Sequence, residues 1–139
     1  MIAIAIVGTL AAIATPTYLS YRNRALISET IGEMGTIEID IGEFMAENGE
    51  LPDSLNDLGL GNLKDPWGNP YEYLRIQGGN LKGKGKLRKD HSLVPVNTDY
   101  DLYSKGKDGK SQTPFTAKAS QDDIVRANDG GFIGLVSDY

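Results

Sequence analysis

The chain has 139 residues, of which 40% are hydrophobic and 24% charged, with 17 glycines, no cysteine and a formal net charge of −5. This length allows one domain with a modest core, and so many glycines favour turns and loops over a helical bundle. The acidic charge argues against nucleic acid as a partner. The lack of cysteine excludes disulfides, thiolate nucleophiles and thiolate metal ligands.

The opening segment, residues 1–16, is almost purely apolar, and the first charge in the chain is Arg22. Residues 1–14 would form roughly 21 Å of helix, whereas a bilayer core is about 30 Å thick and takes on the order of 20 residues. Three interpretations stay open: a short membrane helix, a signal-peptide core, or an apolar helix whose first residues lie upstream. Such a segment needs lipid or other copies of itself to cover it, which predicts an anchored, assembling protein.

From Thr17 to about Asn48 the apolar residues recur at steps of three and four, as they do on one face of a helix. Most of them, with Trp67 from a later turn, are expected to pack between helix and sheet: Ile27, Ile31, Met34, Ile41, Phe44, Met45 and Trp67. Glu38 lies within this apolar face, so we expect it to find a donor or to face a neighbouring copy. A strip of Gly, Ser and Ala beside that face indicates either close approach of another backbone or a loosely packed surface.

The rest of the chain reads as short elements separated by loops: a short helix at 55–58, strands at 71–76 and 99–104, and apolar runs at 124–125 and 132–136. The segment 78–89 is rich in glycine and lysine, and the loop 105–123 has no hydrophobic period. The sequence therefore predicts an α+β fold. In it, the lower half of one long helix lies across a small antiparallel sheet, and the upper half projects unpaired.

Two further polar features of the sequence are candidate sites. The basic run 81–89 is interpreted as a solvated loop tip, with contact to acidic groups of a neighbouring subunit or to an anionic surface as the alternative. His91 is the only histidine, and no Gly-x-Ser-x-Gly motif accompanies it. A catalytic or multi-histidine metal site is therefore not expected.

Three segments, in order, resemble the type IV pilin superfamily, and most closely the major pseudopilin of type II secretion systems. The apolar opening resembles the family's N-terminal helix. Residues 65–71, Asp-Pro-Trp-Gly-Asn-Pro-Tyr, resemble the signature of the major pseudopilin, and 101–109 with the later Asp-Asp-Ile at 122–124 resemble its distal loop. The family's mature chain begins several residues upstream, with a methylated Phe and then a Glu, so we expect this sequence to start late. The segments 82–89 and 108–122 look longer than usual.

This resemblance implies a structural filament subunit rather than an enzyme. Residues 1–25 would be the membrane and filament-core helix and 26–139 the globular head. The chain would sit in the bacterial inner membrane with a periplasmic head and then enter a periplasmic or extracellular filament of its own copies. Minor pseudopilins and an inner-membrane assembly platform are the implied partners. The residues expected to pack in the filament core are Ile2, Ile4, Ile6, Gly8, Leu10, Ile13 and Pro16. Extended chain is expected somewhere from Thr9 to Thr15, because family filaments can lose helical hydrogen bonds there.

In the major pseudopilins the distal loop binds one calcium ion. By resemblance the side-chain ligands would be Asp108, Asp122 and Asp123, and the carbonyl ligands those of Lys105, Lys110 and Ser120. Calcium takes about six to eight oxygens, which an irregular loop with three carboxylates can supply. The alternative is a solvated acidic loop in which Asp123 caps a turn.

Three functions follow from these observations. The first is a major pseudopilin, whose short filament drives export of folded proteins. The second is a type IV pilin that forms a surface filament for adhesion, motility or extracellular contact. The third is a membrane-tethered binding module that never polymerises.

Overall fold

The computed structural model describes residues 2–139. Over that range it contains one long helix, four strands and four short 3₁₀ helices. The helix and strands are α1 (Ile2–Asn48), β1 (Glu72–Arg75), β2 (Tyr100–Ser104), β3 (Ile124–Ala127) and β4 (Phe132–Leu135). The 3₁₀ helices are Leu55–Leu58, Lys118–Ser120, Asn128–Gly130 and Val136–Asp138. The strands form a single sheet in the order β1-β2-β3-β4 with antiparallel neighbours. The predicted α+β fold is confirmed.

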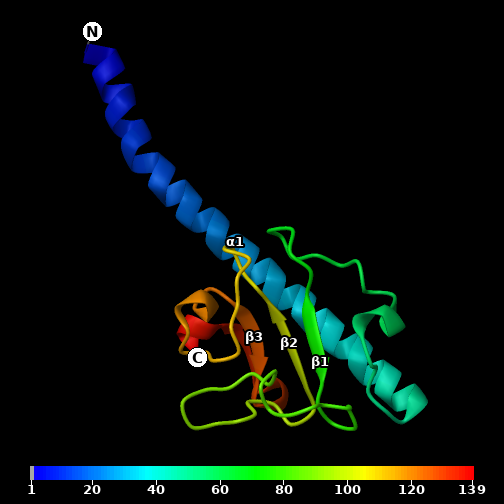
Figure 1. Ribbon diagram of the computed structural model, residues 1–139. Coiled ribbons are helices and arrows are strands. Elements are labelled where there is room, and N and C mark those ends of the chain that lie inside the picture. The colour runs from blue at the N-terminus through cyan, green and yellow to red at the C-terminus, as the bar shows by residue number, and fades with distance from the viewer. Residues whose placement is uncertain (1) are drawn as a thin grey trace.

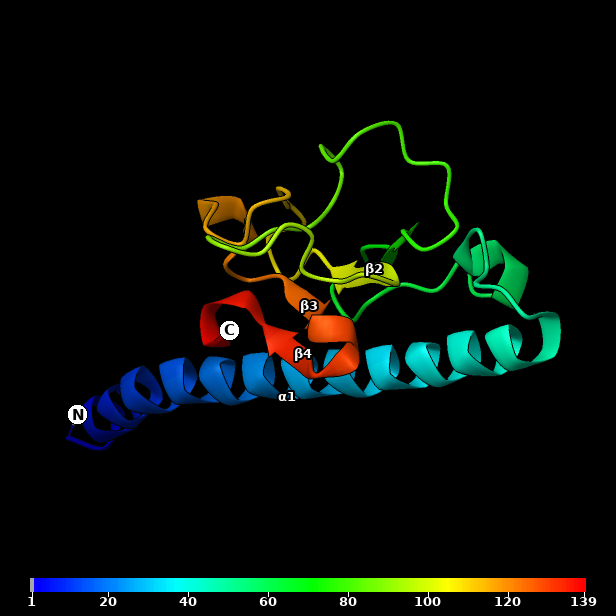
Figure 2. The same ribbon diagram turned by 90° about the horizontal axis from the view of Figure 1, so that it is seen from below.

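Helix α1 lies along one face of the sheet with its C-terminal half, and its N-terminal half projects away from the head (Figures 1 and 2). The expected division at residues 25 and 26 falls inside this helix, so the two parts share one continuous element. The projecting half curves toward its end. It carries Pro16, which lacks the N–H that a helix interior uses.

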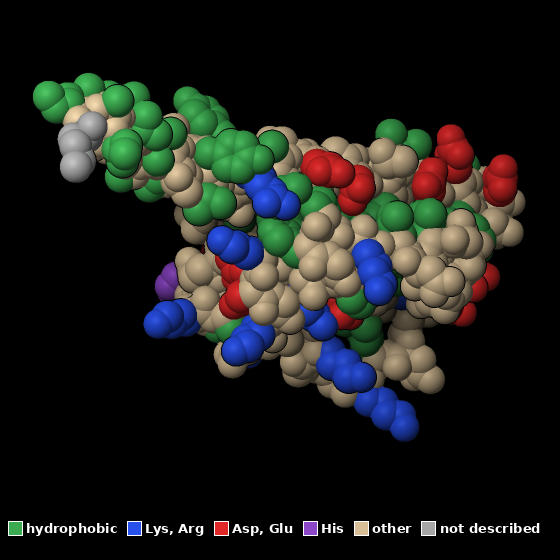
Figure 3. Space-filling view, turned by 90° about the horizontal axis from the view of Figure 1, so that it is seen from above, with side chains coloured by type: hydrophobic (Ala, Val, Ile, Leu, Met, Phe, Trp, Pro, Cys, Tyr) green, Lys and Arg blue, Asp and Glu red, His purple; other side chains and the backbone are tan. Residues whose placement is uncertain are grey.

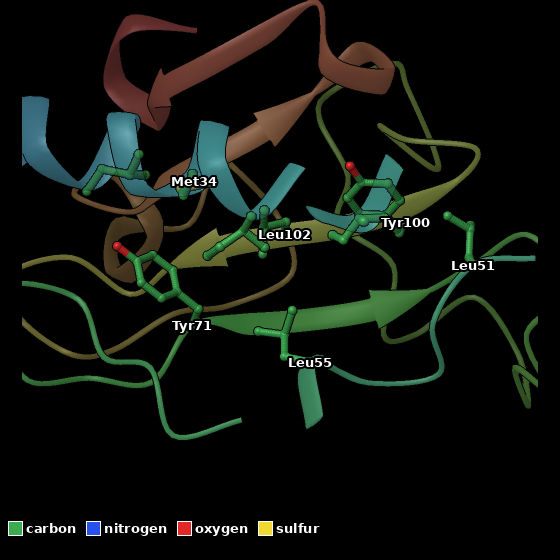
Figure 4. Close-up of a cluster of buried hydrophobic side chains, with 9 residues drawn as sticks. Met34, Leu51, Leu55, Tyr71, Tyr100 and Leu102 are labelled. Atoms are coloured by element: carbon green, nitrogen blue, oxygen red, sulfur yellow. The ribbon is translucent and has the colours of Figure 1, made fainter. Parts of the chain in front are cut away.

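The main core lies between α1 and the sheet. Met34 points from α1 toward Leu102 of β2, with Tyr71 and Leu55 around them (Figure 4). Each of the buried hydrophobic side chains in this cluster is 7% exposed or less, and burying one contributes about 1.5–3 kcal/mol. A second buried cluster lies on the other face of the sheet, around Phe115. The sheet is therefore covered on both sides.

The residues expected to pack on the sheet are placed as predicted with two exceptions. Met34 and Ile41 are buried, and Ile27, Ile31 and Trp67 pack half-buried against the same cluster. Phe44 is only half-buried and Met45 is 42% exposed, and neither belongs to the cluster. The expectation for Met45 is corrected because the last turns of α1 run past the strands (Figure 2).

The stretch from Thr9 to Thr15, expected to be extended in a filament, is helical in this single chain. Threonine hydroxyls add to its backbone hydrogen bonds: Thr9 Oγ1 donates to the carbonyl of Ala5 at 3.1 Å and Thr15 Oγ1 to that of Ala11 at 2.8 Å. Loss of helix there in an assembled filament stays a prediction.

Candidate functional site

The projecting half of α1 is the largest candidate interaction surface. Hydrophobic side chains cover it (Figure 3), and Ile2 is 80% and Ile13 71% exposed. All the residues expected to pack in a filament core are exposed there: Ile2, Ile4, Ile6, Gly8, Leu10, Ile13 and Pro16. Within the described chain, α1 is a helix long and apolar enough to cross a membrane, by length and composition. Apolar surface in water costs about 25 cal/mol per Å², so this half needs lipid or protein around it.

The small residues beside the apolar face of α1 leave open surface. A Cβ added at Gly32, Gly35 or Gly42 would meet no atom within 4 Å. The head itself therefore does not require glycine at these positions. Glu38, by contrast, finds a donor within the chain, because Arg126 Nε lies 2.8 Å from its Oε1.

The segment 65–71 forms a turn that is anchored from inside the head. Asp65 is buried, and its Oδ1 accepts hydrogen bonds from the backbone N–H of Trp67 at 3.1 Å and of Asn69 at 2.9 Å. Its Oδ2 accepts the hydroxyl of Ser104 at 2.6 Å, at the end of β2. Asn69 then donates to the carbonyl of Gly106 at 3.0 Å. This turn therefore fixes the point where the distal loop, residues 105–123, begins.

The distal loop returns on itself at Gly106. Its φ of +63° is left-handed, and a Cβ there would lie 2.0 Å from the carbonyl oxygen of Asp122, so the position requires glycine. Asp108 donates its backbone N–H to Asp122 Oδ2 at 2.9 Å. Burial and the charge of Asp108 raise the pKa of Asp122, although the bond from that N–H opposes the shift. Both carboxylates border an open cavity of about 560 Å³ that Ile27 and Trp67 also line.

Asp123 lies apart from that pair. It is fully buried, and its Oδ2 accepts hydrogen bonds from Arg88 Nη2 at 2.8 Å and from the hydroxyl of Ser111. Burial raises the pKa of Asp123 to about 6, and the bonds from Ser111 and Arg88 limit the rise. The two neighbouring carboxylates therefore have different partners, since Asp122 Oδ2 accepts the N–H of Asp108 and Asp123 Oδ2 accepts from Arg88.

The expected calcium ligands therefore do not converge. No three His, Asp or Glu side chains among residues 2–139 are grouped so that they could hold a metal. The carbonyl of Ser120 accepts the N–H of Asp123 at 3.2 Å, and the side chain of Lys105 pairs with Glu72 at 2.6 Å. Of the three expected carboxylates, only Asp108 and Asp122 lie next to each other, linked by the bond from the N–H of Asp108 to Asp122 Oδ2. The arrangement does not fit the implied three-carboxylate site, and calcium binding itself stays a prediction.

The basic run divides into two parts. Residues 82–86 are exposed, as expected of a loop tip, but Leu87 is only 5% and Arg88 2% exposed. The interpretation of the whole run as solvated is therefore wrong for its end, because Arg88 turns inward to a buried carboxylate. His91 lies on an exposed loop beside Asp90, as predicted.

Comparison with known proteins gives relatives of two kinds. The fimbrial protein of Neisseria meningitidis serogroup A / serotype 4A is 34% identical over 129 residues, which is 93% of this chain and 75% of the relative. The fimbrial protein of serogroup B is 28% identical over 134 residues, or 91% of this chain and 78% of the relative. The type II secretion system core protein G of Pseudomonas aeruginosa is 28% identical over 131 residues, or 79% of this chain and 80% of the relative. No family model and no solved structure matches the chain.

Proposed function

Since this chain belongs to the type IV pilin family, we propose that it is the major subunit of a pseudopilus that drives export of folded proteins through a type II secretion system. As a member of that family it is a filament subunit and a structural protein, not an enzyme. The observation that carries the filament role, common to both candidates, is the bare apolar half of α1, because the head leaves it uncovered.

Two observations favour the pseudopilus. The turn 65–71 has the sequence that resembles the signature of major pseudopilins, and it is held by a buried carboxylate at the start of the distal loop. The chain is also similar, over most of its length, to a core protein G. Minor pseudopilins and an inner-membrane platform would then be its partners.

A surface pilus is the second candidate. It is favoured by the fimbrial relatives, one of which is more similar to this chain than the core protein G is. Adhesion, motility or extracellular contact would then be the role of the filament. Both candidates use the same assembly surface.

The proposed cycle begins in the inner membrane, with α1 in lipid and the head in the periplasm. During assembly, copies of α1 replace the lipid around one another. Lipid already covers apolar surface, so the hydrophobic effect contributes little to this exchange. Close packing of helices and pairing of charges between subunits would supply the difference.

Deletion of the gene, with complementation by the wild-type copy, separates the candidates. Proteins exported to the medium and filaments sheared from intact cells are measured in parallel. Loss of exported proteins without loss of long filaments supports the pseudopilus, and the reverse result supports the surface pilus. If the chain stays monomeric in the membrane and neither changes, the filament proposal fails in favour of a tethered binding module.

A further inference from the structure

We infer that Arg88 is the internal cation that closes the distal loop, in the place where resemblance put a calcium ion, so that the head needs no metal to hold this loop. The inference concerns the head alone and does not depend on which filament the chain forms.

The guanidinium of Arg88 reaches three points on the distal loop. Nη1 donates to the hydroxyl of Ser111 at 2.6 Å and to the carbonyl of Gln112 at 2.8 Å, and Nη2 donates to Asp123 Oδ2 at 2.8 Å. These acceptors lie 23, 24 and 35 residues further along the chain than Arg88. One side chain therefore joins the middle of the loop to its end, which is what a bound cation would do with carbonyl and carboxylate ligands.

The surroundings hold the guanidinium in place. Its Cζ lies 4.4 Å from the ring centroid of Tyr103 and 5.1 Å from that of Phe115, within the range of cation–π attraction. The backbone N–H of Arg88 donates to Asp101 Oδ2 at 2.9 Å. The next residue pairs with the loop as well, because Lys89 accepts the N–H of Phe115 at 2.9 Å. The end of the basic run is thus part of the head.

The charges favour one cation at this point. The side chain of Arg88 is 3% exposed and that of Asp123 is fully buried, so neither charge can be balanced by water. A calcium ion bound to both Asp122 and Asp123 would lie near the guanidinium of Arg88, and the ion and the guanidinium would repel each other. Asp123 Oδ1 is buried without a partner among the described residues and is the oxygen that a metal could still take.

The other acidic residues of the loop are linked without a metal. Asp122 accepts the N–H of Asp108, and Asp108 Oδ1 accepts the N–H of Lys110 at 2.8 Å. Ser120 donates its hydroxyl to the carbonyl of Gln112 at 2.7 Å. Backbone donors thus take the place of an ion at these oxygens. Together with Arg88 they cross-link the distal loop at several points.

The first test uses the full chain in detergent, melted in excess calcium chloride and in chelator. Because Arg88 already supplies the charge, the two melting temperatures should agree. Calcium at about 100 times its dissociation constant would instead stabilise a metal-dependent head measurably. A rise of several degrees in the wild-type chain with calcium would overturn the inference.

The second test replaces the cation. Arg88→Met leaves a buried carboxylate unpaired and should lower the melting temperature by at least about 10 °C. Lys86→Met removes the same charge from an exposed position of the same run and should leave it unchanged. Because the buried carboxylate of Asp123 would then lack a cation, Arg88→Met should also gain a calcium response that the wild-type chain does not have.

Arg88→Lys covers the case in which Arg88→Met does not fold. This variant keeps the positive charge but loses the planar guanidinium. Its melting temperature should therefore lie below that of the wild-type chain and, where Arg88→Met folds, above that of Arg88→Met. An Arg88→Met variant as stable as the wild-type chain would overturn the inference. A destabilised, folded Arg88→Met without any response to calcium would overturn the claim that the arginine stands in the metal's place.

Discussion

Asp65 is the residue on which the start of the distal loop depends. It accepts two backbone N–H groups and the hydroxyl of Ser104 while buried. Asp65→Ala should reduce the free energy of unfolding by about 3 kcal/mol, because these donors lose a charged acceptor out of reach of water. Urea unfolding in detergent measures the loss. Asp53→Ala, which removes an exposed partner of Arg75, is the matched control and should leave the midpoint unchanged. Equal midpoints for both variants would contradict this account.

Asp129 gives a prediction about acid stability. Burial alone would raise its pKa, but hydrogen bonds from the N–H of Thr98 at 2.7 Å and from its hydroxyl at 2.8 Å outweigh burial and lower it below 3.8. A pKa lowered by folding stabilises the head fully above the unfolded value and loses that stabilisation as the pH falls through the folded value. Asp129→Asn should therefore be less stable than the wild-type chain at neutral pH.

The difference between Asp129→Asn and the wild-type chain should shrink as the pH falls below about 4, where the unfolded aspartate becomes protonated. Thermal unfolding of both chains at several pH values from 7 to 2.5 measures this difference in stability. Asparagine tolerates the left-handed backbone of this position, whose φ is +54°, so the substitution tests the charge and not the turn. A gap that stays constant with pH would show that the carboxylate charge does not matter.

At the scale of elements, periodicity predicted most of the fold. The helical spacing of apolar residues identified α1 with its buried Met34 and Ile41, and alternation identified β1 and β2 to within a few residues. It failed for Met45, since spacing does not reveal where the sheet ends beneath a helix. It also failed for Arg88, because a run of lysines and arginines carries no signal of which residue turns inward to a carboxylate 35 residues away.

The open glycines of α1 give a prediction at the same scale. Gly42 is exposed and helical, and a Cβ added there meets nothing within 4 Å. Gly42→Ala should raise the stability of the single chain by up to about 1 kcal/mol, since alanine is the better helix former. Melting in detergent measures the gain, and the yield of filaments then separates the two interpretations of the small-residue strip. Unchanged assembly indicates a loosely packed surface, and lost assembly indicates close approach of another backbone.

At the scale of the whole molecule, the projecting half of α1 was predictable. A run of uncharged aliphatic residues forms a helix that is hydrophobic all round, and a small head cannot cover all of that surface. The site in the head was less predictable. Resemblance named Asp108, Asp122 and Asp123 as a group, but only the structure shows that Asp123 pairs with Arg88 while Asp122 accepts the N–H of Asp108. The buried anchors Asp65 and Ser104 carried no signal beyond their place near the signature turn and the end of a strand.

The projecting half of α1 should tolerate no charge near its middle. Leu10 is 61% exposed in the single chain and lies within the apolar run, so Leu10→Asp would place a carboxylate in lipid at a cost of about 3 kcal/mol. The fraction of chain recovered with membranes after a high-salt wash should fall, and filament yield should fall with it. The melting temperature of the head should not change, because Leu10 is not part of either buried cluster.

Ile39→Asp is the matched control, because Ile39 is 63% exposed on the same helix but lies within the head. It should leave membrane recovery unchanged, since that part of α1 stays in water before assembly. If Leu10→Asp remained in the membrane fraction and still assembled, the apolar half of α1 would be neither the anchor nor the core of the filament. A loss of membrane recovery in both variants would place the lipid contact on the whole helix, which contradicts the division between the projecting half and the half that packs on the sheet.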